Sequence, residues 1–527
     1  MRTVGTYLVE LLEAYGVDTV FGIPGVHTIE LYRGLAASRI RHVTPRHEQG
    51  AGFMADGYAR VSGKPGVCFV ITGPGLSNIA TAMAQAYADS APMLVISSVN
   101  PASTRGLGRL HEMRDQQGLA TSVAAFSAPV RSAAELPVLL ARAFALFEGG
   151  RPRPVHLDIP LDLLGQTAGD VPEPRRAIRN PPLVPAEADL DQAAALLRAA
   201  ERPLILAGGG ALGAAAEVNS LAERLDAPVA MTVNARGLLA PDHPLALSYS
   251  ASLPAVRALI AESDVVLAIG TELGQTDYDM YAEGGFAIPG KLIRLDIEVE
   301  QLIRNALPEI ALLGDAAAGC DGLLDRLPAR HGDGADRAGK ARAAARQSLS
   351  PGMVADIALL DAVRDVVPEA RIVGDSTHAV YAGNLGYAAA APGLWFNAAT
   401  GYGALGYGLP AAIGAALAEP GRPVLCLVGD GGLQFSLAEF GTAVEAGTSV
   451  IVLLFNNFGY GEIKSAMVAA GVTSVGVDLH TPDFQALARA YGWSAEILSD
   501  PAELGDRLRA ALRSRCPTLI ELQEQPI

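Results

Sequence analysis

The chain has 527 residues, of which 50% are hydrophobic and 18% are charged, and this length predicts roughly three domains. The formal net charge of −16 argues against a nucleic-acid partner, because phosphate binding needs a basic surface. No apolar run reaches the roughly 18 residues of a transmembrane helix, and Glu10 and Glu13 interrupt the pattern of a secretory signal. The four cysteines have no metal-binding or disulfide spacing. We therefore expect a soluble cytoplasmic protein.

Buried strands are predicted in the first 165 residues, where short apolar runs end in turn residues: DTVFGIPG, GVCFVITGPG, PMLVISS and PVHLDIP. These runs do not alternate with polar residues, and helical patterns separate them. They therefore predict a parallel sheet with helices on both faces. The stretch 166–186 is rich in proline and charge, which predicts a linker.

The same pattern recurs twice further along the chain. Residues 186–328 contain the runs PLILAGGGALG, PVAMTV, DVVLAIG and KLIRLDI, and residues 351–527 contain ARIVGDS, PVLCLVGD, SVIVLLFNN and PTLIELQ. Residues 329–350 are polar and rich in alanine and arginine, and they are interpreted as a second linker. The predicted fold class is α/β, with three parallel-sheet domains at 1–165, 186–328 and 351–527.

An acid and an amide follow two successive strands of the last domain. Asp430 comes directly after the first apolar run, and Asn456 and Asn457 close the second. Ligands bind beyond the carboxyl ends of parallel strands, so these side chains can meet at one edge of the sheet. Their oxygens suit Mg²⁺, and the backbone N–H groups of Gly431 and Gly432 suit a diphosphate. An isolated GDG can also be a simple turn in which Asp430 caps a helix.

Five motifs then point to a known family: FGIPG at 21–25, RHEQGAGFMADGYAR at 46–60, TGPGLSN at 72–78, GYGALGYGLPAAIGA at 401–415, and GDGG followed by NN. In these motifs the chain resembles the thiamine-diphosphate enzymes of the acetolactate synthase, benzoylformate decarboxylase and pyruvate oxidase superfamily. The resemblance covers essentially the whole chain. It implies a pyrimidine-binding N-terminal domain, a Rossmann-like middle domain and a diphosphate-binding C-terminal domain. It also implies thiamine diphosphate and Mg²⁺ as cofactors.

The resemblance further implies where the cofactors bind. Asp430 and Asn457 would be metal ligands through their side chains, and Gly459 through its backbone carbonyl. Leu405 would hold thiamine diphosphate in a bent shape, and the carbonyl of Gly403 would accept a hydrogen bond from its aminopyrimidine. The other expected cofactor contacts are Thr377, His378, Gly429, Gly431, Gly432, Tyr460 and Gly461. The alternative for the histidine in this set is a surface or capping residue.

Glu48 is the expected catalytic residue. Taken by itself, an acid in this stretch is more often a solvated helix residue, but the small neighbours Gly50, Ala51 and Gly52 argue for close packing. A buried carboxyl has a raised pKa and can share a proton with a ring nitrogen. The resemblance implies that Glu48 bonds the pyrimidine N1′ and favours the imino form. Because Glu48 and Asp430 lie in different domains, it also implies a homodimer or homotetramer with active sites at the subunit interface.

The expected substrate is a 2-oxo acid, and several segments look most similar to 5-guanidino-2-oxopentanoate (2-ketoarginine) decarboxylases. This similarity implies non-oxidative decarboxylation to 4-guanidinobutanal and CO₂. Glu462 is expected near the substrate, because a carboxylate can pair bidentately with a guanidinium group. The alternative for Glu462 is an ion pair with Lys464 or exposure to water. Asp115, Gln116 and His27 are further candidate substrate contacts, although residues such as the first two more often belong to a solvated charged loop.

Two other functions remain open from the sequence. One is a carboligase that joins two 2-oxo acids, as acetolactate synthases do. The other is a non-catalytic scaffold that binds the cofactor, against which Glu48 and the metal pair argue.

A dinucleotide fingerprint, Gly208-x-Gly210-x-x-Gly213, follows a predicted strand of the middle domain. That fingerprint also needs an acid at the end of the next strand, which here reads MTVNARG. Some members of the superfamily hold FAD in this domain. Because GTELGQTD stands where they usually carry a Gly-x-Arg-x-x-Asp-Arg-like segment, we expect no flavin.

Overall fold

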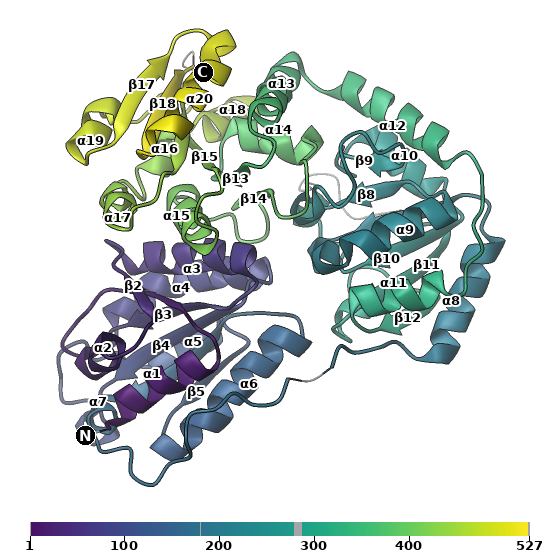
Figure 1. Cartoon of the computed structure of the whole chain (residues 1–527). Coiled ribbons are helices and arrows are strands. Elements are labelled where there is room, and N and C mark those ends of the chain that lie inside the picture. The colour runs from purple at the N-terminus through teal and green to yellow at the C-terminus, as the bar shows by residue number, and fades with distance from the viewer. Residues whose placement is uncertain (1, 180, 279–286, 525–527) are drawn as a thin grey trace. The chain divides into compact units, whose positions relative to one another are not determined.

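The computed structural model of the protein describes residues 2–179, 181–278 and 287–524. Within these residues lie three six-stranded sheets, and helices alternate with their strands along the chain (Figure 1). The predicted α/β class with three parallel sheets is confirmed. The residues group into two compact units, one from 1–180, 402–499 and 511–527, the other from 181–401 and 500–510. Every described helix is too short or too polar to cross a bilayer.

The first sheet has the strand order β2-β1-β3-β4-β6-β5. Its strands are β1 (Thr19–Gly22), β2 (Arg41–Val43), β3 (Gly66–Val70), β4 (Met93–Val99), β5 (Phe126–Pro129) and β6 (Val155–Pro160). Its helices are α1 (Val4–Ala14), α2 (Ile29–Ala36), α3 (Glu48–Ser62), α4 (Pro74–Ala88), α5 (Gln116–Thr121), α6 (Leu136–Gly149) and α7 (Leu161–Leu164). Apolar side chains of α1, α2 and α6 pack with the inner strands into one core.

The middle sheet has the order β12-β11-β10-β7-β8-β9. Counted from its own first strand this is 3-2-1-4-5-6, the order of dinucleotide-binding folds. Its strands are β7 (Pro203–Ala207), β8 (Val229–Met231), β9 (Ala246–Leu247), β10 (Val265–Ile269), β11 (Lys291–Asp296) and β12 (Ile310–Leu313). Its helices are α8 (Glu187–Ala199), α9 (Ala215–Leu225), α10 (Pro254–Ala261), α11 (Ala316–Leu324) and α12 (Gly334–Ser348).

The segment 329–350 differs from the linker that the sequence predicted. Most of it forms α12, whose residues Ala338, Ala341 and Ala345 are buried in an apolar core with β7, β10 and α10. These alanines recur at helical spacing and form a narrow apolar stripe on an otherwise polar helix. Small side chains therefore allow a charged helix to pack closely, and composition alone did not reveal it.

The third sheet has the order β14-β13-β15-β16-β18-β17, which repeats the order of the first sheet when counted from its own first strand. Its strands are β13 (Arg371–Gly374), β14 (Trp395–Asn397), β15 (Val424–Gly429), β16 (Ile451–Asn456), β17 (Ser494–Leu498) and β18 (Thr518–Gln523). Its helices are α13 (Pro351–Val366), α14 (His378–Gly386), α15 (Gly408–Ala418), α16 (Asp430–Leu433), α17 (Glu439–Glu445), α18 (Gly461–Ala469), α19 (Phe484–Ala490) and α20 (Leu504–Ser514).

Helices α3 and α15 pack backbone to backbone. A Cβ atom on Gly57 would lie 2.0 Å from the carbonyl oxygen of Ala411, and one on Gly414 would lie 1.9 Å from that of Met54. No side chain fits at either position, so both glycines are needed for this contact. The pairing also shows that the two helices run antiparallel, because the later residue of α3 meets the earlier residue of α15.

The stretch 166–186 has no helix or strand among its described residues, as a linker should. Two tyrosines of the first domain hold its N-terminal half. The Tyr7 hydroxyl donates to the carbonyl oxygen of Pro172 at 2.9 Å, and the backbone N–H of Ala177 donates to the Tyr15 hydroxyl at 3.2 Å. This part of the linker is therefore fastened to the first domain.

Candidate active site

Three oxygen-bearing groups meet beyond the carboxyl ends of β15 and β16. The strands pair in parallel with Gly429 beside Phe455, so the residues that follow the strands lie next to each other. One terminal atom of the Asn457 amide lies 3.2 Å from Asp430 Oδ1 and 2.8 Å from the carbonyl oxygen of Gly459. The structure thus brings together the three residues that the sequence predicted as metal ligands.

The spacing of these groups fits a small, hard cation. A nitrogen of the Asn457 amide at this place would donate to both neighbours, whereas an oxygen would complete a set of three oxygens. Adjacent corners of a magnesium octahedron lie about 3.0 Å apart when the metal–oxygen distance is near 2.1 Å. Asp430 Oδ2 is buried and has no hydrogen-bond partner among the described residues, which a cation would supply. Burial raises the pKa of Asp430, and a cation would reverse that effect.

The oxygen set contains one carboxylate only. In the part of the chain that the structure describes, no group of three or more His, Cys, Asp or Glu side chains could hold a metal. A Mg²⁺ ion often takes few protein ligands and completes its shell with water and phosphate oxygens. The donor set therefore suits an ion that is held jointly by protein and diphosphate.

The local backbone decides which asparagine faces Asp430. Asn456 donates to a carboxylate oxygen of Glu521 at 2.8 Å and accepts from the backbone N–H of Phe458 at 3.2 Å, so it is held inside the sheet. A Cβ atom on Gly459 would lie 2.2 Å from the carbonyl oxygen of Val477. Glycine is therefore required there, and its carbonyl is fixed beside the Asn457 amide.

The other predicted diphosphate contacts lie at helix starts. Gly429 precedes α16, which begins with Asp430, Gly431 and Gly432, and Gly461 is the first residue of α18. A Cβ atom on Gly431 would lie 2.7 Å from the ring of Tyr460, the residue before α18, so the two segments touch. In the other compact unit, Thr377 and His378 begin α14 directly after β13. Helix N-termini suit anionic groups, but the role of each residue stays a prediction.

Glu48 is the first residue of α3 and is only 8% exposed, so the expected close packing is confirmed. Asn78 on α4 donates its side-chain N–H to Glu48 Oε2 at 2.9 Å. A Cβ atom on Gly52 would lie 2.4 Å from that of Ala82, which explains why small residues flank Glu48. The carboxylate is therefore held in one orientation by a neighbouring helix.

Glu439 supports the same helix start from the C-terminal part of the chain. Its carboxylate accepts from the backbone N–H of Arg46 at 3.0 Å and from the Thr442 hydroxyl at 2.5 Å, and burial raises the pKa of Glu439. A Cβ atom on Gly50 would lie 2.4 Å from Glu439 Oε1. The sequence analysis did not single out Glu439 or Asn78. Only Asn78 had a signal, because it ends the motif TGPGLSN.

Glu48 and the turn before α15 lie at opposite ends of the α3–α15 pair. The later part of α3 meets the start of α15, and Ala404 in the turn donates its backbone N–H to Gln85 Oε1 on α4 at 3.1 Å. Glu48, at the N-terminal end of α3, lies about 14 Å from Gly57 along the helix axis, since a helix rises about 1.5 Å per residue. Within one chain, Glu48 therefore does not reach Gly403 or Leu405.

Comparison with known proteins agrees with this geometry. Residues 2–119 match the thiamine pyrophosphate enzyme N-terminal TPP binding domain, residues 190–323 the central domain, and residues 374–522 the C-terminal TPP binding domain. The chain belongs to the thiamine pyrophosphate enzymes. Thiamine pyrophosphate is another name for thiamine diphosphate, so the predicted family and this predicted cofactor are confirmed.

Two curated relatives span nearly all of this thiamine pyrophosphate enzyme. The probable 2-ketoarginine decarboxylase AruI of Pseudomonas aeruginosa is 48% identical over 99% of this chain and 94% of its own. The acetolactate synthase isozyme 1 large subunit of Escherichia coli is 33% identical over 98% of this chain and 93% of its own.

The candidate substrate contacts of this enzyme have different surroundings. Asp115 caps α5 by accepting from the backbone N–H of Gly118 at 2.8 Å. Gln116 is buried, donates to Asp158 Oδ1 at 2.7 Å and accepts from the backbone N–H of Gly73 at 2.9 Å. Both side chains thus have structural partners, and their contact with substrate stays a prediction.

The other two candidates differ in exposure. Glu462 is exposed on the first turn of α18, and Lys464 pairs instead with Asp478 at 2.7 Å. His27 is buried with its ring 5.0 Å from that of His111, and its Nδ1 has no hydrogen-bond partner among the described residues. Burial and the neighbouring His111 lower the pKa of His27.

The glycine fingerprint of the middle domain serves backbone packing. Gly208 donates its N–H to the carbonyl oxygen of Ile269 at 2.9 Å, and Gly210 donates to that of Gly270 at 3.0 Å. A Cβ atom on Gly208 would lie 2.2 Å from the Gly270 oxygen. These amides therefore bond to the neighbouring loop rather than pointing toward a pyrophosphate. The expectation of no flavin stays a prediction.

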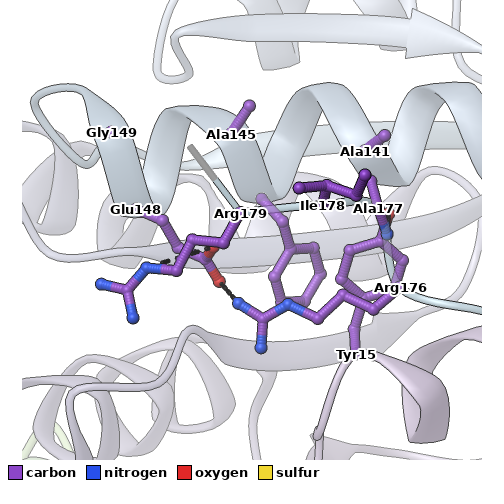
Figure 2. A pocket seen from close by; sticks show the side chains of 10 residues that line it. Tyr15, Ala141, Ala145, Glu148, Gly149, Arg176, Ala177, Ile178 and Arg179 are labelled. Atoms are coloured by element: carbon purple, nitrogen blue, oxygen red, sulfur yellow. Dashed lines mark hydrogen bonds and ion pairs between the residues drawn. The ribbon is translucent and has the colours of Figure 1, made fainter. Parts of the chain in front are cut away.

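A pocket beside the linker is too small for a substrate (Figure 2). Its volume of about 30 Å³ has room for about two water molecules. Figure 2 shows Arg176 and Arg179 on either side of the Glu148 carboxylate, with which both form ion pairs. The two ion pairs fasten this part of the linker to α6.

Proposed function

We propose that this enzyme decarboxylates a 2-oxo acid without oxidation, converting 5-guanidino-2-oxopentanoate to 4-guanidinobutanal and CO₂. The observation that carries the proposal is the buried, oriented Glu48 in a chain that resembles a probable 2-ketoarginine decarboxylase along its whole length. An acetolactate synthase-like carboligase is the second candidate, because the acetolactate synthases also match along their length, at lower identity.

The residues at the carboxyl ends of β15 and β16 would bind the diphosphate end of the cofactor through Mg²⁺. Asp430, Asn457 and the carbonyl of Gly459 would supply three ligands, and the buried unpaired oxygen of Asp430 supports this assignment. Thiamine diphosphate, when bound, supplies the ring that holds the carbanion electrons after CO₂ leaves. Asp430 and its neighbours would therefore position the diphosphate end of the cofactor.

Glu48 would exchange a proton with the pyrimidine ring nitrogen. Asn78 donates to Oε2, which orients the carboxyl and leaves Oε1 to face the ring. Because Glu48 is only 8% exposed, water has little access to its carboxyl group, which would favour proton exchange with the ring nitrogen over exchange with solvent. Glu439 keeps the start of α3 in place through the backbone of Arg46.

We propose a homodimer or a larger homo-oligomer in which each site combines two subunits. Glu48 and Leu405 of one chain lie at opposite ends of the α3–α15 pair, so one chain cannot bring both to one cofactor. Several exposed apolar side chains lie on segments around the two half-sites: Val26, Ile29, Tyr402, Phe435, Ile463 and Val468. A second copy would cover them. Sedimentation of the holoenzyme as a monomer would disprove this arrangement.

Glu462 would receive the guanidinium group of the substrate. It is exposed at the start of α18, two residues after Tyr460 and next to Gly461, in the segment that carries the predicted diphosphate contacts. We expect Glu462→Leu to raise the KM for 5-guanidino-2-oxopentanoate at least tenfold and to change the KM for 2-oxohexanoate much less, since only the cationic substrate loses a charged partner. Equal changes for both substrates would contradict this role.

The reaction is tested by incubating the protein with thiamine diphosphate and Mg²⁺, and with 5-guanidino-2-oxopentanoate or pyruvate in separate assays. CO₂ with 4-guanidinobutanal from the first substrate supports the proposal. Acetolactate from pyruvate would favour the carboligase. Saturable cofactor binding without turnover of any 2-oxo acid would favour the non-catalytic scaffold that binds the cofactor.

A further inference from the structure

The turn from 402 to 407 contains no helix or strand. Gly403 and Gly406 have positive φ angles of 71° and 81°, and regular structure begins only with α15. Between them lies Leu405, the residue expected to hold the cofactor bent. Yet Ala404 and Tyr407, on either side of Leu405, are both buried. The turn is therefore fixed by its neighbours.

A chain of polar contacts begins at Ala404. Its backbone N–H donates to Gln85 Oε1 at 3.1 Å, and Gln85 donates through Nε2 to Asp89 Oδ2 at 2.6 Å. Asp89 in turn forms an ion pair with Arg60 at 2.8 Å. Gln85 is fully buried and Asp89 has a side-chain exposure of 2%, so water does not compete for these contacts.

The same chain returns to the turn at Tyr407. Arg60 forms a second ion pair with Asp56 Oδ1 at 2.6 Å, and the Tyr407 hydroxyl donates to the same oxygen at 2.6 Å. Asp56 and Tyr407 are fully buried. Burial alone would lower the pKa of Arg60, but Asp56, Tyr407 and Asp89 raise it overall, so the guanidinium stays charged. We call the side chains of Gln85, Asp89, Arg60, Asp56 and Tyr407 the clamp.

We propose that the clamp positions the 402–407 turn for thiamine diphosphate, so that Gln85 and Tyr407 are positioning residues for cofactor binding. This inference rests on the proposed function of Gly403 and Leu405. The clamp accepts a hydrogen bond from the backbone N–H of Ala404 and includes the side chain of Tyr407. It therefore holds the turn on both sides of Leu405 and Gly406. A displacement of about 1 Å at such a site can cost on the order of a hundredfold in rate. Releasing either end should therefore weaken the fit of the turn to the cofactor.

A purely structural role for the clamp makes a different prediction. The same residues lie where α3, α4 and α15 pack, so they also stabilise the fold. Tyr58 offers a matched control. It lies on α3, like Asp56 and Arg60, but its hydroxyl donates to Asp18 and not to a residue of the clamp. Replacing Tyr58 or Tyr407 by phenylalanine removes one hydroxyl that donates to a carboxylate in each case.

The test measures the Kd for thiamine diphosphate at saturating Mg²⁺, by quenching of intrinsic fluorescence, together with the Tm without cofactor. We expect Tyr407→Phe to raise this Kd at least about tenfold, the effect of losing a hydrogen bond to a charged group. Tyr58→Phe should change the Kd less than twofold, even if it lowers the Tm as much. Gln85→Met breaks the other end of the clamp and should raise the Kd in the same way.

Three outcomes separate the explanations. A normal Kd in Tyr407→Phe and Gln85→Met, with a lower Tm, would show that the clamp is structural and overturn the inference. Equal Kd changes in Tyr407→Phe and Tyr58→Phe would do the same. If the wild-type protein itself binds no thiamine diphosphate, the proposed function fails rather than the clamp. If Tyr407→Phe does not fold, the Gln85→Met result decides.

Discussion

The side-chain N–H of Asn78 donates to Glu48 Oε2 across 2.9 Å, from the second turn of α4 to the first residue of α3. Two helices that cover one sheet thereby orient one carboxylate. Other active-site groups converge in a similar way, because the carboxyl ends of parallel strands lie at one edge. The first predictions concern this pair.

Glu48→Gln should abolish turnover and leave thiamine diphosphate binding intact, because the amide fills the same space but cannot take up the proton. Asn78→Ala should lower kcat about tenfold to a hundredfold through loss of orientation. Ser77→Ala is the control for the second variant, since among the described residues its hydroxyl donates to the Pro74 carbonyl of its own helix and not to Glu48. Steady-state kinetics with CO₂ detection measure both effects, and wild-type turnover in Glu48→Gln would refute the role of this residue.

Asp430→Asn should separate stability from cofactor binding. Burial raises the pKa of Asp430, so its ionised form disfavours the folded apoprotein, and a neutral amide of the same shape should raise the Tm without cofactor. The rise in Tm on adding Mg²⁺ and thiamine diphosphate should disappear, because one metal ligand has lost its charge. Thermal scanning fluorimetry with and without both ligands checks this. A full ligand-dependent rise in the variant would show that the oxygen set is not the metal site.

Asp158 and His156 predict opposite effects of pH on stability. Burial raises the pKa of Asp158 to about 6, so its contribution to stability is present in acid and is lost as the pH rises through that value. Burial lowers the pKa of His156 to about 3, so its contribution is present near neutrality and is lost as the pH falls below the ordinary value of 6.5. Between about pH 4 and 6 the two effects offset each other.

Asp158→Asn should therefore make the protein more sensitive to acid. The variant keeps the destabilising effect of His156 and loses the compensation, so its urea midpoint should fall more steeply than that of the wild type between pH 6.5 and 4. Asp158 also accepts a hydrogen bond from Gln116 and lies near the positive charge of Arg105, which both lower its pKa. Parallel urea curves for the two proteins over this range would contradict the prediction.

Gly57→Ala should destabilise the protein by about 1–3 kcal/mol, the usual cost of overpacking. The added Cβ atom would lie 2.0 Å from the Ala411 carbonyl oxygen, so α3 and α15 would have to separate. Gly149→Ala is the matched control in α6, because its Cβ atom would meet nothing within 4 Å. It should be neutral or stabilise by up to about 1 kcal/mol. Urea unfolding of both variants gives the comparison.

The sequence predicted the inner strands of each sheet and missed the edges. In the first sheet the missed strands are β2 and β5, in the middle sheet β9 and β12, and in the third sheet β14 and β17. Inner strands are covered on both faces and read as unbroken apolar runs, such as Val424–Gly429. Edge strands are short or partly exposed, as Arg41–Val43 and Ser494–Leu498 show, and these two strands carry no such run.

Residues of the candidate site could be predicted from the sequence only where they belong to a recognisable motif. Asp430 and Asn457 directly follow two recognisable strands, and the structure places them together. Glu439 had no such signal, because its contact with Arg46 joins segments 393 residues apart. For Gln116 the resemblance suggested a substrate contact, and the structure adds a buried hydrogen bond to Asp158 that no sequence pattern announced.

The antiparallel contact of α3 and α15 has a consequence for how defects combine. In the proposed dimer each catalytic centre contains Glu48 of one subunit and the proposed metal ligands of the other. A mixed pair in which one subunit lacks Glu48 and its mate lacks Asp430 would keep one centre that is complete and one that is doubly damaged. Two inactive proteins could thus restore activity when they assemble together, and loss of function would belong to the pairing rather than to the single polypeptide.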